Sequence, residues 1–262
     1  MAGEFGGKVV VVSGGSRGIG RAIAAAFATE GATVVLAASS EANLRAAADA
    51  IAANGAPPPD ICAADLRHLD GCERVFRLVE ERHGRCDILV NSAGATRAGA
   101  FLDLSDDLWQ DGFALKLFAA VRLCRLFWPM LKAAEGHVVN IIGGAARTPD
   151  PEFLIGGSVN GAMANFTKGL AGLGKRDGVN VNAIHPGMTE TERVEQLFRQ
   201  RAEAQGVSPE EVRARAVAKD GLRRLGRPED IAALTLFLCS ERARHIQGVA
   251  VAVDGGATPG LY

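Results

Sequence analysis

Residues 13–20, with the sequence SGGSRGIG, have the composition and spacing of a loop that binds phosphate. Gly14, Gly18 and Gly20 follow a short apolar run and open a run of helical period, in the pattern G-x-x-x-G-x-G. Glycines allow a tight turn and a close approach of backbone N–H groups to a pyrophosphate, which the amino end of a helix attracts. A tight turn that binds no ligand would show the same pattern. Other segments of the chain are therefore needed to distinguish a phosphate-binding loop from such a turn.

Three further motifs follow in chain order. NSAG (91–94) comes directly after one apolar run, and HPGMTET (185–191) comes directly after another. The segments RLGRPEDIAALTLFLCSE and GVAVAVDGG lie near the carboxyl end. Together with the glycine-rich turn, these motifs favour a dinucleotide-binding chain over an empty turn.

The elements that must position these motifs alternate along the whole chain. Short apolar runs are separated by longer alanine-rich segments of helical period, which predicts a parallel sheet with helices on both faces. We therefore expect an α/β fold of the doubly wound Rossmann type, in a single domain over residues 1–262. Residues 188–221 are a charged helical insertion, for which a solvated helix pair and a lid over the ligand site are both open. The seven expected strands are residues 8–13, 32–38, 60–65, 87–92, 137–142, 179–184 and 248–253.

Composition excludes several other classes of protein. The chain of 262 residues is 48% hydrophobic with a formal net charge of -1, so bulk charge supplies no attraction for nucleic acid or an anionic membrane. Five scattered cysteines, none in a C-x-x-C pair, predict neither a disulfide framework nor a metal site. The absence of a leader-like segment and of a long apolar run predicts a cytoplasmic protein.

The motifs in register from Lys8 to Gly256 resemble those of the short-chain dehydrogenase/reductase family, in its single-domain members of about this length. The resemblance implies the same doubly wound fold, a bound NAD(H) or NADP(H), a small-molecule substrate and a homotetramer. Carried over by position, the residues expected at the cofactor, from its pyrophosphate and adenine to its nicotinamide, are Gly14, Ser16, Arg17, Gly18, Ile19, Gly20, Ser39, Asp65, Leu66, Asn91, Ala93, Gly94, Pro186, Gly187, Thr189 and Thr191.

The charge at the end of the second expected strand bears on the choice of cofactor. A carboxylate there would grip a ribose 2′-hydroxyl and repel a 2′-phosphate, but this chain has Ala38, Ser39 and Ser40. Arg17, inside the glycine-rich turn, and the two serine hydroxyls are suited to meet a 2′-phosphate. The sequence therefore favours NADP(H) over NAD(H). If Arg17 points to solvent instead, either cofactor could bind.

The catalytic group of the family is an asparagine, a serine, a tyrosine and a lysine, and the resemblance fails at all four. The segment NFTKGLAG (165–172) aligns without gaps to the family's helix, which places Gly156 at the tyrosine and Asn160 at the lysine. Gly143 then stands at the serine, and Lys116 stands at the asparagine. The only tyrosine of the chain is Tyr262, its last residue. Loss of a positioned acid or base typically costs about 10²–10⁴-fold in rate, so the ordinary mechanism is not expected.

Lysine and asparagine have exchanged places relative to the family. Lys116 and Asn160 would face one pocket, so an ammonium could still reach a substrate from the opposite helix. The two glycines remove bulk, which predicts a wider pocket. Two functions follow: an atypical NADP(H)-dependent oxidoreductase acting on a carbonyl, an alcohol or an activated double bond, or a catalytically silent dinucleotide-binding protein, serving as a sensor or as the partner of an active relative.

Overall fold

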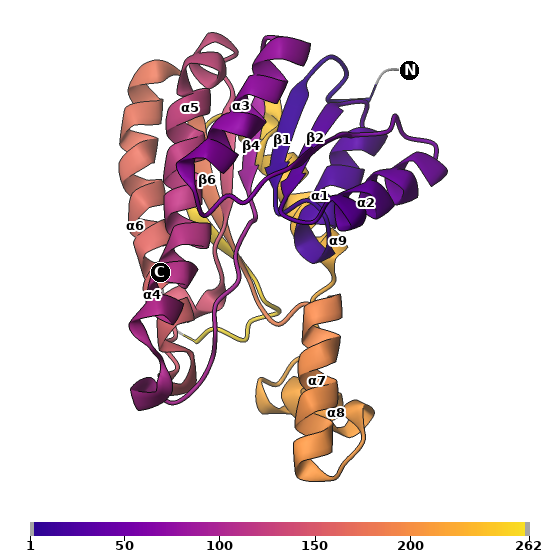
Figure 1. The fold of residues 1–262 in the computed structure, drawn as a ribbon, viewed down its shortest axis with the longest axis vertical. Helices are drawn as coiled ribbons and strands as arrows, with labels where there is room; N and C mark the ends of the chain where they lie inside the picture. Colours follow the sequence, from indigo (N-terminus) through magenta and orange to yellow (C-terminus); the bar gives the residue numbers. More distant parts are fainter. Residues whose placement is uncertain (1–2, 260–262) are drawn as a thin grey trace.

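The structure of the protein is a computed structural model, which describes residues 3–259. Its centre is a sheet of seven parallel strands in the order β3-β2-β1-β4-β5-β6-β7 (Figure 1). The doubly wound sheet expected from the alternation of elements is therefore confirmed. The strands are β1 Val9–Ser13, β2 Thr33–Ala38, β3 Asp60–Ala63, β4 Ile88–Asn91, β5 His137–Ile141, β6 Asn180–Pro186 and β7 Ala250–Val253.

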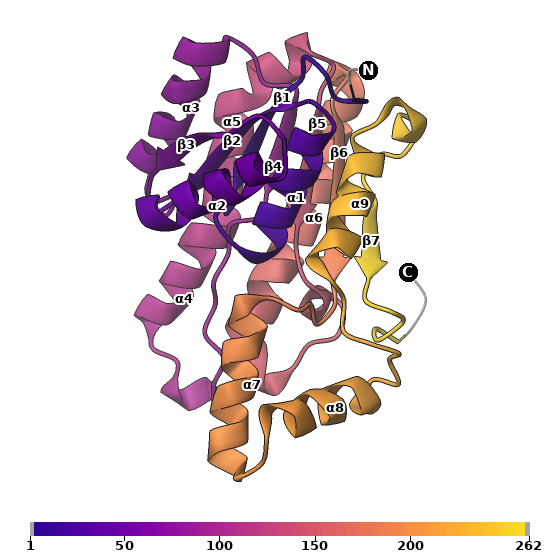
Figure 2. The same ribbon diagram turned by 90° about the vertical axis from the view of Figure 1, so that its right-hand side faces the viewer.

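Helices cover both faces of the sheet, as Figures 1 and 2 show. One hydrophobic cluster packs α1, α2 and α9 against one face, and a second packs α3, α5 and α6 against the other. Every residue of β1, β4, β5 and β6 is buried, which is why these strands read as short apolar runs. The helices are α1 Gly18–Thr29, α2 Glu41–Ala53, α3 Leu69–His83, α4 Asp106–Phe113, α5 Ala119–Ala133, α6 Leu154–Asp177, α7 Glu192–Gln205, α8 Pro209–Lys219 and α9 Pro228–Leu238.

The strand order reverses between β1 and β4, whose carboxyl ends carry the glycine-rich turn and the NSAG motif. Loops to opposite faces of the sheet diverge at such a point and leave a crevice for a ligand. The fold therefore brings the motifs of the sequence together at one edge. Among residues 3–259, no helix is long and apolar enough to cross a bilayer.

The helical segment between β4 and β5 contains an irregularity. α4 continues into a π-helical turn, Ala114–Phe118, and then into α5. Such turns carry one extra residue within a helix and occur frequently at functional sites. Lys116 lies at the centre of this turn.

The insertion at residues 188–221 forms α7 and α8, which extend away from the sheet beyond the carboxyl ends of the strands (Figures 1 and 2). These helices have a small hydrophobic cluster of their own, which includes Phe198, Val212 and Leu225. α7 is held to the main body at its first turn, because Glu192 forms an ion pair with Arg21 of α1 at 2.9 Å.

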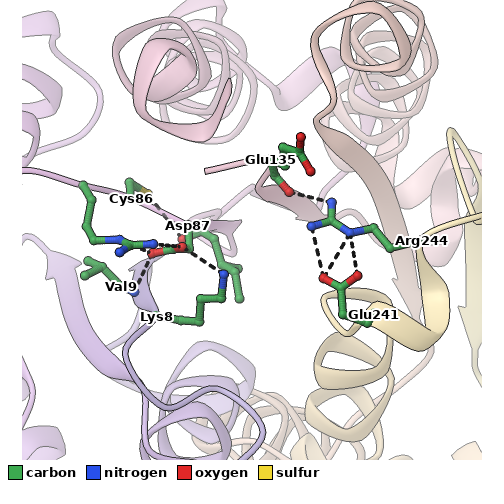
Figure 3. Close-up of polar contacts among 9 residues, drawn as sticks. Lys8, Val9, Cys86, Asp87, Glu135, Glu241 and Arg244 are labelled. Carbon is green, nitrogen blue, oxygen red and sulfur yellow. Dashed lines mark hydrogen bonds and ion pairs between the residues drawn. The ribbon is translucent and has the colours of Figure 1, made fainter. Parts of the chain in front are cut away.

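The amino ends of the strands hold a separate polar cluster, drawn in Figure 3. The carboxylate of Asp87 is 2% exposed and accepts hydrogen bonds from Arg85 at 2.6 and 2.9 Å, from the backbone N–H of Val9 at 2.9 Å, and from Lys8 at 3.3 Å. Burial alone would raise the pKa of this carboxyl, but these donors hold the pKa of Asp87 below its ordinary value. Opposite them, Arg244 pairs with Glu241 at 3.2 Å.

Candidate cofactor cleft and active site

A cavity of about 640 Å³ opens at the carboxyl ends of the strands. It runs from the end of β2, past the glycine-rich turn, to the π-helical turn and the first turn of α7. Most of the residues expected at a cofactor line this one cavity. They are Gly14, Ser16, Arg17, Ile19, Gly20, Ser39, Asp65, Leu66, Ala93, Gly94, Pro186 and Thr191.

The glycine-rich turn is shaped by close backbone contacts. Gly14 has a φ of +70°, and a Cβ there would lie 2.8 Å from the backbone of Ala93. A Cβ on Gly20 would overlap the carbonyl of Gly14. The first turn of α1 has neither a side-chain cap nor an acidic residue, so its N–H groups are free to meet an anion. The residues present therefore fit a pyrophosphate.

Some expected residues stand outside the lining of this cavity and shape its walls. Asn91 is buried and donates from Nδ2 to Asn140 Oδ1 at 2.8 Å. Thr189 donates from its hydroxyl to the carbonyl of Gly187 at 2.9 Å. Gly18 allows the start of α7 to approach closely, because a Cβ on Gly18 would lie 3.1 Å from Cγ2 of Thr191, the residue that caps α7.

The end of the cavity near β2 has no carboxylate on that strand. Arg17 and Ser39 are both exposed and line the cavity. The hydroxyl of Ser40 instead caps α2, accepting from the backbone N–H of Asn43 at 3.3 Å, and Ser40 does not line the cavity. Of the two expected hydroxyls, Ser39 is thus the one in position.

Lys116 lies at the other end of the cavity. Its Nζ donates to the carbonyl of Ile142 at 2.8 Å, and its stem runs beside Gly94, where a Cβ would lie 3.1 Å from Lys116 Cδ. Burial, with a smaller contribution from the positive charge of Arg193, lowers the pKa of Lys116 to about 8. The structure describes no carboxylate paired with this ammonium within residues 3–259.

Asn160 and Gly143 form a fitted pair beside Lys116. Asn160 is buried, and its Oδ1 has no hydrogen-bond partner among the described residues. Gly143 has a φ of +133°, and a Cβ there would lie 2.9 Å from Asn160 Nδ2. Gly143 lines the cavity, whereas Asn160 stands behind it. A serine at position 143 would therefore meet both backbone strain and the Asn160 amide.

Phe153 occupies the place that a side chain at position 156 would take. A Cβ built on Gly156 would overlap the ring of Phe153, so this ring must move before any larger residue fits. The expectation that the two glycines widen the pocket is therefore wrong. The room that each glycine leaves is filled by a neighbour, Phe153 at one and Asn160 at the other.

The cavity also has lining residues that the sequence motifs did not single out. Arg67 lines the cavity beside Asp65 and forms ion pairs with Asp65 and with Asp111 of α4. Arg193 and Gln196 of α7 line the opposite end, and Arg193 donates to the carbonyl of Thr96 at 2.9 Å. The only signal for the two α7 residues was the position of their segment after β6.

His185 supports the wall of the cavity at the end that holds Lys116 and Gly143, which we call the reactive end. Its Nδ1 lies 2.9 Å from the carbonyl of Gly143. Burial lowers the pKa of His185, and the hydrogen bond to Gly143 opposes this shift. Near neutral pH the ring is therefore mainly uncharged.

Comparisons with known proteins agree with this geometry. Residues 14–258 match a family model described as enoyl-(acyl carrier protein) reductase. The chain is 31% identical over 262 residues to an uncharacterized oxidoreductase, YvaG, of Bacillus subtilis, covering 98% of each chain. It is 33% identical over 259 residues to the 3-oxoacyl-[acyl-carrier-protein] reductase FabG of Escherichia coli, covering 97% of this chain and 98% of the relative.

Solved structures give the same result. The L-sorbose reductase of Gluconobacter frateurii, in complex with NADPH and L-sorbose, superposes with a TM-score of 0.94 at 33% identity over the whole of both chains. The actinorhodin polyketide ketoreductase with NADPH superposes with a TM-score of 0.92 at 28% identity, covering 99% of this chain and 100% of the other. The cleft, the strand order and these relatives together show that the chain belongs to the short-chain dehydrogenase/reductase family of oxidoreductases.

Proposed function

We propose that this protein is an NADP(H)-dependent oxidoreductase that acts on a carbonyl compound or the corresponding alcohol, with Lys116 as its acid. The observation that carries the proposal is the half-buried Lys116 ammonium in the cavity wall, whose hydrogen bond within residues 3–259 is to the carbonyl of Ile142. The proposal extends to compounds with an activated carbon–carbon double bond, because reduction of that bond also requires a hydride and a proton.

The choice of NADP(H) is supported by the cavity end near β2. Arg17 offers a planar fork of donors there and Ser39 offers a hydroxyl, while no carboxylate ends β2 to repel a phosphate. The uncapped first turn of α1 would hold the pyrophosphate. The L-sorbose reductase and the polyketide ketoreductase, which share this fold, are both described with NADPH.

NADPH, when bound, supplies the hydride that forms the new C–H bond at the carbonyl carbon. Lys116 then releases a proton from Nζ to the carbonyl oxygen, so that an alcohol leaves and the lysine is neutral until solvent protonates it. A pKa of about 8 suits this step, because an acid is most effective when its pKa lies near the working pH. The Ile142 carbonyl fixes the position of Nζ.

A catalytically silent nucleotide-binding protein is the second candidate function. The observation that favours it is the ring of Phe153 over Gly156, which closes the place of the family's tyrosine. The φ of +133° at Gly143 likewise closes the place of the serine. In this alternative the chain would bind NADPH without oxidising it and would act as a sensor or as the partner of an active relative.

The experiment that separates the two functions measures NADPH binding and NADPH oxidation in the same samples. The unmutated protein is compared with Lys116→Met and with Lys168→Met, a control in which an exposed α6 lysine outside the cavity is changed. Oxidation of NADPH with a panel of ketones and aldehydes should fall only in Lys116→Met, while calorimetric affinity for NADPH stays within about twofold. Binding without oxidation by the unmutated protein would support the silent function instead.

A further inference from the structure

We infer that the reactive end of the cleft selects substrates that carry a carboxylate, and that Arg193 of α7 is the residue that recognises it. The inference rests on the proposed function, because it names the substrate class of the same site. The charged residues in the lining are Arg17, Asp65, Arg67, Lys116, Glu192 and Arg193.

The two carboxylates of the lining are already paired within the chain. Asp65 is bonded to Arg67, and Glu192 is bonded to Arg21 at 2.9 Å. Lys116 and Arg193 bond only to backbone carbonyls among the described residues, at 2.8 Å to Ile142 and 2.9 Å to Thr96. The reactive end of the cavity therefore holds two cations without an anion between them.

The position of Arg193 distinguishes it from a ligand of the cofactor's pyrophosphate. Its neighbour Glu192 reaches α1, where the pyrophosphate would lie, whereas Arg193 reaches Thr96 in the loop after β4. Thr96 lies beside α4, since a Cβ on Gly112 would be 3.2 Å from Thr96 Cγ2 and 2.7 Å from Ile155 Cγ2. Ile155 precedes Gly156 in α6, so Arg193 bonds to the side of the cleft that carries the substituted catalytic positions.

Guanidinium and carboxylate groups match in shape as well as charge, and their hydrogen bonds are among the strongest in proteins. A carboxylate beside the carbonyl would draw Arg193 from the Thr96 carbonyl, a neutral acceptor, to a charged one. Substrate charge would thus place the carbonyl at the end of the cavity that holds Lys116.

The test uses binding to the NADPH complex and does not require turnover. The probes are 2-oxobutanoate, 3-oxobutanoate and 4-oxopentanoate, each with its methyl ester, titrated while the fluorescence of bound NADPH is recorded. At least one acid should bind about tenfold more tightly than its ester, the lower end for a charged hydrogen bond. In Arg193→Gln the acid and ester should bind within about twofold of each other. Arg201→Gln, which changes an exposed arginine of α7 outside the cavity, should keep the preference.

Three results would overturn the inference. They are equal binding of every acid and its ester, no binding of any probe to a protein that binds NADPH, and a loss of NADPH affinity in Arg193→Gln as large as the loss for the acid. The last result would assign Arg193 to the cofactor. Because the fluorescence is read immediately on mixing, before NADPH is oxidised, a failure of the proposed catalysis leaves the carboxylate preference measurable and separate.

Discussion

The two ends of the sheet differ in whether a charged side chain that is shielded from solvent has an oppositely charged partner. At the amino ends, the Asp87 carboxylate is surrounded by Lys8, Arg85 and the backbone N–H of Val9, and its charge is matched (Figure 3). At the carboxyl ends, the Lys116 ammonium is held by one carbonyl and stands near another cation. Removing one partner of a matched, buried charge pair destabilises a fold, whereas an unmatched charge in a cleft is available to a ligand.

A second difference concerns the titration of the groups at each end. At the amino ends, burial lowers the pKa of His137 to about 4, which keeps this buried ring neutral under ordinary conditions. At the carboxyl ends, the pKa of Lys116 is about 8, which is close to neutral pH. Of these two groups, Lys116 is the one whose pKa allows it to exchange a proton near neutral pH.

The largest expected effect is on reaction rate at the carboxyl end. With simple ketones, kcat/KM for NADPH oxidation should lie at least about 10²-fold below that of a relative that retains the family's tyrosine and lysine, because Gly156 supplies no acid. Lys116→Met should lower any residual rate further. Steady-state kinetics measure both. A rate equal to the relative's that stays unchanged in Lys116→Met would show that an acid other than Lys116 replaces the tyrosine.

At the amino end the expected effect is on stability. Asp87→Asn removes the charge that Arg85 and Lys8 share, and should lower the free energy of unfolding by about 3 kcal/mol. Urea denaturation measures it, with Asp49→Asn, an exposed residue of α2, as the control. NADPH affinity of the folded variant should not change. If Asp87→Asn weakened nucleotide binding without loss of stability, it would be wrong to assign stability to the amino ends and ligand binding to the carboxyl ends.

The next effect concerns the choice of nucleotide at the carboxyl end. Arg17→Ala should weaken the binding of NADPH by about 1.5–3 kcal/mol and should weaken the binding of NADH much less. The reason is that only NADPH carries the 2′-phosphate. Calorimetric titration of both nucleotides is the measurement, and Arg45→Ala, an exposed residue outside the cavity, is the control. Equal affinities of the unmutated protein for NADPH and NADH would contradict the assignment of Ser39 and Arg17 to a phosphate.

The sequence predicted the parts of the molecule that depend on local pattern. Alternating apolar and helical runs were enough to predict the sheet, and the glycine spacing was enough to predict the turn after β1, since Gly14 and Gly20 admit no Cβ there. The strand bounds differ only at their ends, as in β3, which ends at Ala63 rather than at residue 65.

The parts that the sequence did not predict depend on contacts between distant segments or on side-chain placement. Arg193 meets Thr96 across 97 positions, and neither belongs to a motif. The ring of Phe153 over Gly156 depends on the turn that precedes α6, which composition does not define. Helical periodicity also cannot reveal the single extra residue of the π-helical turn around Lys116.

The smallest expected effect is a gain in stability when the unmatched charge is removed. Lys116→Met should raise the free energy of unfolding at pH 7 by about 1 kcal/mol, because the desolvation cost of the half-buried ammonium exceeds the stabilisation from its hydrogen bond to Ile142. The gain should depend on pH in a defined direction. The folded-state pKa of Lys116, about 8, is below its ordinary value of 10.5, so between these values the unfolded chain binds more protons than the folded chain.

The unmutated protein therefore gains stability through Lys116 as pH rises from 8 to 10.5, and the methionine variant does not. The advantage of Lys116→Met should shrink across this window, whereas the difference between the unmutated protein and Lys168→Met should stay constant. Urea denaturation of the three proteins at pH 7, 9 and 10.5 measures it. A methionine variant that is less stable at every pH by the same amount would mean that Lys116 is matched in the folded protein, as Asp87 is, and that its charge serves the fold.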